Sequence, residues 1–322
     1  MGDDRLDSDV DLDFLRSSAR GFLAERGEKN SICDLAEMDW IGLLVSEEFS
    51  GSGWRPLESC VIAEELGRAH DPTPWLSSVV AAAALASAPG ELRDRWLPSL
   101  LKGTKIGGFA RAARTVRVID GDNTDVLVTA DRDGVYLLKA LGTQPRWVDA
   151  QALDTGRTIW CIDISTATAI PIGDGSKAAE LQSISHLLVS SDAIGALANS
   201  IERLVAYLRD RVAFGVPIAS FQAIQHRLVD LLVFEVKARA IVANAARALA
   251  EGNAAVSLAA AAHAFVAAKA TRAIDECMQL SGGIGFTWEY PLHHDLRRAS
   301  DDAWLFGTAR SSRALLAEVS GW

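Results

Sequence analysis

The sequence predicts an α+β protein with three consecutive parts: an N-terminal α-helical domain over residues 1–103, a small middle β domain over residues 104–184, and a C-terminal antiparallel four-helix bundle over residues 185–322. In the first and third parts, apolar residues recur at helical spacing, whereas the middle part has alternating residues and turn signals. The helices expected in the third part are long and joined by short turns, which is typical of an antiparallel bundle.

The N-terminal domain is expected to begin with an amphipathic helix. Asp9 is a suitable N-cap, and Gly27 follows the expected helix end. The apolar residues between them share one face: Val10, Phe14, Leu15, Phe22 and Leu23. A later helix is expected to open at Pro56, because proline is favoured in the first turn.

The middle domain contains a hairpin signal. The stretch TDVLVTADRDGVYLLKA has two strand-like runs joined through Asp133-Gly134. The later stretch TIWCIDIST divides between two faces, with Ile159, Cys161 and Asp163 on one and Trp160, Ile162 and Ile164 on the other. Apolar residues on both faces predict a strand that is packed on both sides.

Four helices are expected in the bundle. The first begins near Ser185, and the second runs from a cap at Ser220 to a stop at Gly252. The third passes through AFVAAKATRAIDECMQL to Gly282, and the fourth covers the region after Arg297. Their alanine-rich faces would let helices approach closely, either within the bundle or against a partner.

Composition excludes several function classes. The formal net charge of −10 argues against binding to nucleic acid or to an anionic membrane surface. No targeting segment is expected, and the most apolar run, SSVVAAAALASAPG, is too short to cross a membrane. The cysteines are far apart and form no CxxC pair: Cys33, Cys60, Cys161 and Cys277. We therefore expect a reduced cytoplasmic protein.

No metal site is predicted. His226 stands beside Arg227 and is expected on a polar helix face, while the His293-His294 pair is expected in a solvated loop. Neither has a third ligand at a suitable spacing.

Three blocks of sequence carry a family resemblance. WIGLLVSEEFSGSGWRPLESCVIAEELGR, RVAFGVPIASFQAIQHRLVDLL and QLSGGIGFTWEYPLHHDLRRA resemble, in this order, the acyl-CoA dehydrogenase family of flavoproteins. The resemblance is strongest over residues 200–310, good over residues 38–110 and poor between them. It implies the same arrangement of helical domain, small β domain and four-helix bundle.

The resemblance also implies a cofactor site at a subunit interface. In the family, Arg-x-x-Phe-Gly and Phe-Gln motifs of one subunit hold the adenosine and pyrophosphate end of FAD bound in its neighbour, and a Gln-x-x-Gly-Gly turn contributes. The matching positions are Arg211, Phe214, Gln222, Gln279, Gly282 and Gly283. Arginine pairs well with pyrophosphate, and glycine lets backbone come close.

These residues also have a purely structural interpretation. Arg211 would favour the dipole at a helix end, and Phe214 would simply pack there. Gln279 could be a solvated helix residue, and Gly282-Gly283 a C-cap.

The catalytic base of the family has no counterpart here. The reaction removes an α-hydrogen of an acyl-CoA as a proton and needs a nearby carboxylate. The two positions that carry this base in the family fall on Phe306 and Ala268. A shifted alignment would offer Asp301 or Asp302 instead. The sequence therefore predicts no catalytic residue in this chain.

The flavin-ring half of the family site is also degraded. After KIGGFA the chain has neither the acid-Pro nor the Gly-Ser-Asp motif, and Trp160 lacks the usual Thr or Ser two residues later. The middle domain is also shorter than in the family.

These observations lead to one hypothesis and two alternatives. The chain is interpreted as the non-catalytic subunit of a hetero-oligomeric FAD-dependent acyl-CoA dehydrogenase, sharing FAD with a full-length catalytic subunit in an α2β2 heterotetramer. Acyl-CoA would bind in the partner's site. Such split enzymes are known in the family among actinobacteria that degrade steroids. The alternatives are a self-sufficient homo-oligomeric dehydrogenase with an unusual base, and a scaffold protein that has lost FAD.

Overall fold

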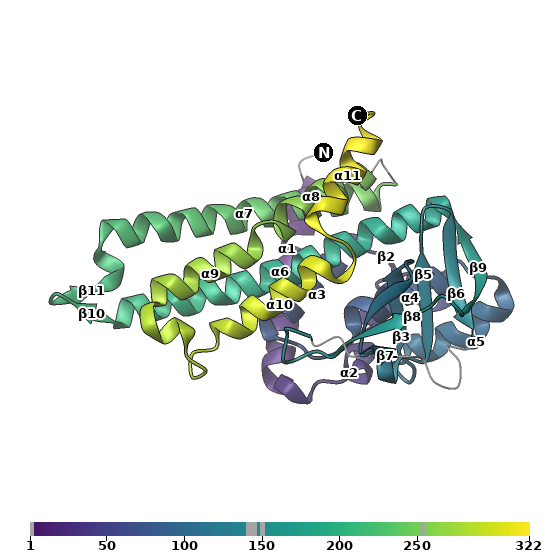
Figure 1. Cartoon of the computed structure of the whole chain (residues 1–322), viewed down its shortest axis with the longest axis horizontal. Coiled ribbons are helices and arrows are strands. Elements are labelled where there is room, and N and C mark those ends of the chain that lie inside the picture. Colours follow the sequence, from purple (N-terminus) through teal and green to yellow (C-terminus); the bar gives the residue numbers. More distant parts are fainter. Residues whose placement is uncertain (1–2, 140–146, 149–151, 253–254) are drawn as a thin grey trace.

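The computed structural model describes residues 3–139, 147–148, 152–252 and 255–322. Long helices lie side by side along the molecule, and the strands gather at the end opposite the β10–β11 hairpin (Figure 1). The predicted α+β class and the order of helical, β and helical parts are confirmed. Within the described ranges, no helix combines the length and the apolar character that a membrane span requires.

The N-terminal part is helical apart from a short hairpin. Its helices are α1 (Asp3–Arg26), α2 (Ile32–Glu37), α3 (Pro56–Ala69), α4 (Trp75–Ala86) and α5 (Gly90–Leu101), and its strands are β1 (Leu44–Val45) and β2 (Gly53–Trp54). Pro56 opens α3 and Gly27, at φ +56°, follows α1, as predicted. The predicted cap at Asp9 was wrong. Residues 3–8 include neither glycine nor proline, so the helix continues through them.

Two sheets form the middle part. The strands are β3 (Gly107–Arg111), β4 (Thr115–Ile119), β5 (Val126–Ala130), β6 (Gly134–Lys139), β7 (Trp147–Val148), β8 (Ile159–Asp163) and β9 (Thr168–Asp174). One sheet has the order β3-β5-β6-β9, in which only β3 and β5 are parallel, and the other has the antiparallel order β4-β8-β7.

Both local predictions in the middle part are confirmed. The β5–β6 hairpin turns through Asp133-Gly134, and the Asp131 carboxylate accepts hydrogen bonds from both of their N–H groups at 2.9 and 3.0 Å. On β8, Ile159 and Ile162 point to opposite faces and are both buried, so this strand is packed on both sides.

Among its described residues, the C-terminal part is helical apart from a short hairpin and the connecting turns. Its elements are α6 (Gly175–Asp210), β10 (Val212–Ala213), β11 (Val216–Pro217), α7 (Gln222–Ala250), α8 (Ala255–Ala267), α9 (Ala270–Ser281), α10 (Leu292–Leu305) and α11 (Ala309–Val319). The helices α6, α7, the α8–α9 pair and α10 lie alongside one another (Figure 1).

Several predicted helix limits in this part were wrong. The first helix begins at Gly175 instead of near Ser185, because the Asp174 carboxylate caps it by accepting from the Lys177 N–H at 3.0 Å. Phe221, not Ser220, is the N-cap of α7, since the Ser220 hydroxyl donates to the Pro217 carbonyl at 2.7 Å.

The third and fourth predicted helices are each divided. The third breaks where Lys269 adopts φ −131°, between α8 and α9. The fourth already begins at Leu292 and breaks at Gly307, whose φ is +141°, before Thr308 caps α11. Glycine accepts this φ without strain, and threonine is a favoured cap. The domain limits at residues 103 and 184 stay predictions.

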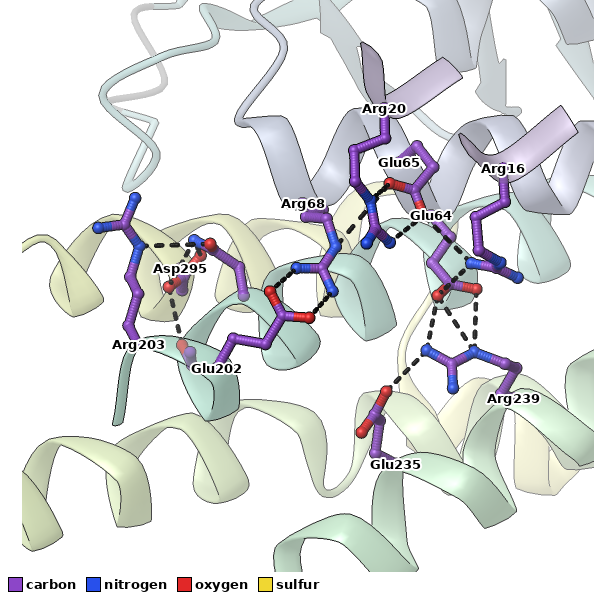
Figure 2. A network of polar contacts seen from close by, with 12 residues as sticks. Arg16, Arg20, Glu64, Glu65, Arg68, Glu202, Arg203, Glu235, Arg239 and Asp295 are labelled. Carbon is purple, nitrogen blue, oxygen red and sulfur yellow. Dashed lines mark hydrogen bonds and ion pairs between the residues drawn. The ribbon is translucent and has the colours of Figure 1, made fainter. Parts of the chain in front are cut away.

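The N-terminal helices are attached to the bundle at close range. An ideal Cβ on Gly195 of α6 would lie 1.9 Å from the Glu64 carbonyl oxygen, and one on Gly67 of α3 would lie 2.1 Å from that of Asp192. Beside this contact, the two buried carboxylates Glu64 and Glu65 of α3 pair with arginines of neighbouring helices (Figure 2). These ion pairs link α1, α3 and α7, and Arg68 of α3 pairs with Glu202 of α6 as well (Figure 2).

Candidate functional site

Arg211, Phe214 and Gln222 lie together at the free end of the bundle. Arg211 is the residue after α6, Phe214 lies in the turn between β10 and β11, and Gln222 is the first residue of α7. Phe214 is 96% exposed and adopts φ +53°, which is rare for an aromatic residue. Of the described carboxylates, none lies within 4.0 Å of the Arg211 guanidinium. The hairpin therefore presents an unpaired cation and an open aromatic ring.

Helix α9 runs toward the end of the bundle that carries the β10–β11 hairpin (Figure 1). Gln279, Gly282 and Gly283 lie at and just after the C-terminus of this helix. Gln279 is in the last turn of α9, and Gly282, at φ +69°, starts the 3-10 helix η6 (Gly282–Phe286). A Cβ built on either glycine would meet no atom within 4 Å. The glycine pair thus leaves an open backbone surface, and all six residues predicted from the family motifs are exposed at this end.

Phe306 and Ala268, the two positions predicted to lack the base, lie in different surroundings. Phe306 is only 1% exposed, and its ring packs edge-on against that of Phe109 on β3, with ring centres 5.7 Å apart. Ala268 is exposed at the break between α8 and α9. The first position is therefore filled by packed aromatic rings, and neither side chain can accept a proton.

The alternative bases Asp301 and Asp302 are enclosed by polar partners. Asp301 accepts a hydrogen bond from the Asp154 N–H at 2.8 Å, and Asp302 accepts one from Arg157 Nη2 at 2.8 Å. Burial, with the nearby Asp192 carboxylate adding to it, raises the pKa of Asp302 well above its usual range. Both side chains are buried and belong to an ionic cluster between α10 and the middle domain.

Arg298 lies at the centre of this buried ionic cluster. Its guanidinium donates to both oxygens of the Asp192 carboxylate, at 2.7 and 2.8 Å, and to the Asp71 carbonyl at 2.8 Å. Arg157 lies beside it and donates to Asp154 at 3.0 Å. The cluster joins α6, α10, the segment after α3 and the middle domain, so its role is structural.

A group of polar residues that the sequence analysis missed lies beside Phe306. His186 of α6 and His263 of α8 are buried, and their rings stack with centres 4.4 Å apart and planes 7° from parallel. His263 Nδ1 shares a hydrogen bond with the Ser312 hydroxyl at 2.7 Å, while Nε2 of both rings has no partner among the described atoms. Arg111 of β3 approaches the same place. Arg111, His186 and His263 are far apart in the sequence and share no motif.

Burial of this histidine pair predicts a stability that depends on pH. Burial, and then the charge of Arg111, lowers the pKa of His263 to about 4. The unfolded chain binds this proton near pH 6.5, so stability is full above that pH and is lost as pH falls toward 4. We expect His263→Asn to reduce the loss of unfolding free energy between pH 7 and pH 5 by about 2 kcal/mol.

Urea unfolding at the two pH values measures this difference. His226→Asn is the matched control, because His226 is exposed on α7 as predicted, and its profile should follow the wild type. An unchanged pH dependence in His263→Asn would contradict the lowered pKa.

His293 and His294 do not lie where the sequence analysis expected them. His293 and His294 lie in the first turn of α10 and are half-buried, so the predicted solvated loop was wrong. The His293 ring packs against Trp288, with centres 4.5 Å apart. Across the parts of the chain that the structure describes, no group of three or more His, Cys, Asp or Glu side chains is placed to hold a metal ion.

Comparisons with known proteins place this geometry in a family. Residues 13–104 match the N-terminal domain of acyl-CoA dehydrogenases, and residues 177–321 match their C-terminal domain. Over 279 residues the chain is 34% identical to acyl-CoA dehydrogenase IpdE2 of Mycolicibacterium smegmatis, covering 86% of this chain and 83% of that protein.

The chain belongs to the acyl-CoA dehydrogenase family. IpdE2 of Mycobacterium tuberculosis is also similar, with 32% identity over 92% of this chain and 89% of that protein. The predicted resemblance is thereby confirmed. Residues 105–176, most of the middle domain, lie outside both matched domains.

Solved acyl-CoA dehydrogenases share the whole fold. The Tcur3481-Tcur3483 steroid ACAD G363A variant superposes with a TM-score of 0.85 at 20% identity, covering 97% of this chain and 98% of that one. The ChsE4-ChsE5 complex from Mycobacterium tuberculosis gives a TM-score of 0.82 at 22% identity, with 97% coverage of both. Acyl-CoA dehydrogenases are FAD-dependent oxidoreductases. A glutaryl-CoA dehydrogenase from Mycobacterium smegmatis in complex with FADH2 superposes with a TM-score of 0.79 at 18% identity, covering 97% of this chain and 95% of that one.

The residues present fit only one end of the FAD of an acyl-CoA dehydrogenase. Arg211 and the open glycine pair suit a phosphate group and a close backbone approach. Beside β3, by contrast, Phe109 and Phe306 occupy the space, and the adjoining pocket measures only about 200 Å³. Sites for ligands of drug size usually measure about 300–1,000 Å³. The pocket beside β3 is therefore smaller than the sites that usually hold ligands of this size.

Proposed function

We propose that this chain is the non-catalytic subunit of a hetero-oligomeric, FAD-dependent acyl-CoA dehydrogenase in the cytoplasm. It completes the FAD site of a full-length catalytic subunit, which binds the acyl-CoA and provides the base. One contrast carries the proposal: Arg211 is exposed and has no described carboxylate partner, while the base position holds the buried Phe306.

The exposed end of the bundle supports the sharing of a cofactor. A guanidinium without a described carboxylate partner is available to a pyrophosphate, and charge-assisted hydrogen bonds of this kind are strong. Phe214, at 96% exposure, contributes no packing within its own chain beyond an edge contact with Phe221. Both features are explained by a ligand held between this chain and another.

An apolar face on α7 supports a protein partner. Val229, Leu232, Val233 and Val236 recur at helical spacing and are each 42–55% exposed. Near η6, Phe286 and Trp288 are exposed as well. Contiguous exposed apolar residues of this kind mark interaction surfaces. We assign this face to the full-length subunit, in an α2β2 heterotetramer.

Relatives favour two different subunits and a bulky acyl group. The names of two similar structures, the ChsE4-ChsE5 complex and the Tcur3481-Tcur3483 steroid ACAD, each join two proteins. By analogy, the acyl-CoA bound by the partner of this chain is steroid-derived.

Two rival functions have less support. A self-sufficient dehydrogenase would need Asp301 or Asp302 as its base, but both are buried with polar partners. A scaffold that has lost FAD would leave the exposed Arg211 and Phe214 without a role.

Flavin content tests the proposal. The chain is purified alone and after co-expression with a full-length acyl-CoA dehydrogenase encoded beside it, and visible absorbance is measured. We expect no flavin in the chain alone and about one FAD per pair of subunits in a stable yellow complex. One FAD per chain in the isolated protein would overturn the proposal in favour of a self-sufficient enzyme, and a stable complex without flavin would favour the scaffold.

A further inference from the structure

A pocket of about 330 Å³ lies between α1, α3, α6 and α7, and the proposed function does not use it. Protein interiors are close-packed and hold few voids larger than a water molecule. Sites for small organic ligands usually measure about 300–1,000 Å³. The volume of this pocket therefore suits a compact organic molecule.

The floor of the pocket is apolar and buried. It is formed by Val61 of α3, Ile194 of α6 and Val242 of α7, each of which is at most 5% exposed. Leu57 and Ala243 add to the apolar lining. Side chains from three helices thus surround one space, and an occupant would gain dispersion contacts with all of them. The floor favours a ligand with an apolar body.

The pocket also has a charged side. Its lining contains three arginines and two carboxylates, so one positive formal charge is in excess; they are Arg16, Arg239, Arg247, Asp13 and Glu64. Asp13 and Arg247 are exposed, and the pocket therefore meets the solvent on this side. An excess positive charge at the entrance favours an anionic head group over a cationic one.

Glu64 holds two of these arginines in place (Figure 2). Its carboxylate accepts hydrogen bonds from Arg239 Nε at 3.1 Å and Nη2 at 2.7 Å, and Arg16 Nη1 lies 2.7 Å from the same carboxylate. Arg239 Nη1 and Arg16 Nη2 donate to none of the residues that the structure describes. Two guanidinium groups are thus fixed beside the pocket with unused N–H groups, and such groups pair well with a carboxylate.

We propose that this pocket binds a compact apolar monocarboxylate, whose body packs on the buried floor and whose carboxylate accepts hydrogen bonds from Arg16 and Arg239. The site is separate from the proposed cofactor site. Gln222 begins α7, and Ala243 lies about 30 Å further along this helix. A ligand in the pocket therefore does not compete with FAD.

Calorimetric titration tests the site with the full-length chain, or with its complex if the chain alone is insoluble. Octanoate, 1-octanol and octylamine have the same chain length and differ in the head group. We expect octanoate to bind at one site per chain and the other two to bind about tenfold more weakly or less, because they lack the charge-assisted hydrogen bonds. No binding of octanoate, or equal binding of either analogue, would overturn the proposal.

Ala243→Phe tests the location of the site. The new ring fills the pocket from α7, so octanoate should bind about tenfold more weakly or less. Ala240→Phe is the matched control, because Ala240 is exposed on the same helix, and it should bind octanoate as the wild type does. Equal affinity of the two variants would place the ligand elsewhere and refute the site.

A further measurement does not depend on a variant folding. Octanoate with a diazirine group on its chain is irradiated with the wild-type chain, and mass spectrometry locates the label. We expect label on peptides that contain Val61 or Val242, and less of it when octanoate is added in excess. Label confined to the exposed face around Val229 and Val236 would contradict the proposal. Flavin content is measured separately, so this site and the proposed function can fail independently.

Discussion

Replacing Arg211 with methionine is expected to weaken FAD binding by the assembled enzyme about 10- to 100-fold, because a charge-assisted hydrogen bond to phosphate contributes about 1.5–3 kcal/mol. Arg211 is exposed and has no described carboxylate partner, so the substitution removes no contact that holds this chain together. The stability of the isolated chain should therefore stay within about 0.5 kcal/mol of the wild type. FAD affinity is measured by fluorescence titration of the apo-complex.

Arg209→Met is the control for this prediction. Arg209 is also exposed and lies in the last turn of α6, two positions before Arg211. It changes the net charge by the same amount, so any general electrostatic effect appears in both variants. Equal FAD affinity of the two variants and the wild type would contradict the assignment of Arg211 to a shared site.

Replacing Arg298 with methionine is expected to lower the free energy of unfolding by about 3–5 kcal/mol, since it leaves the buried Asp192 carboxylate without its bidentate partner. The same change removes a hydrogen bond to the Asp71 carbonyl. Because domains of this kind are stable by only about 5–15 kcal/mol, soluble yield should fall markedly. Urea unfolding at pH 7 measures the loss.

Two further variants test whether the unpaired charge of Asp192 causes the loss of stability. Arg310→Met removes an exposed arginine of α11 and should change stability by less than about 0.5 kcal/mol. The double variant Arg298→Met with Asp192→Asn should recover part of the loss, because it no longer buries an unpaired charge. A single variant as stable as Arg310→Met would show that the cluster contributes little.

Local signals predicted much of the fold. Pro56 at a helix start, Gly27 after a helix end and Asp133-Gly134 in a hairpin each fix the backbone over a few residues, and all three were correct. Predictions of helix limits failed where several signals compete. Ser220 could cap a helix, but the hairpin before it directs its hydroxyl to Pro217 instead.

In the candidate site, too, residues in continuous motifs could be predicted, and residues brought together by packing could not. The exposed positions at Arg211 and Gly282 stand in continuous motifs, so a family resemblance could locate them, although their role in binding FAD stays a prediction. Arg111, His186 and His263 belong to three separate elements and meet only when the middle domain packs on the bundle. The stacked histidines could not be predicted from one sequence, because neither His186 nor His263 stands in a motif that names its partner.

The backbone contact between α3 and α6 has an evolutionary consequence. Any side chain at Gly67 or Gly195 would place its Cβ about 2 Å from a carbonyl oxygen of the facing helix, so the two helices would have to separate. In a subunit of the proposed kind, selection no longer preserves a reaction at Phe306, but these two glycines stay fixed by geometry. Substitutions in such a chain are then limited by the need to keep α3 against α6, and so to keep the shape that the partner binds.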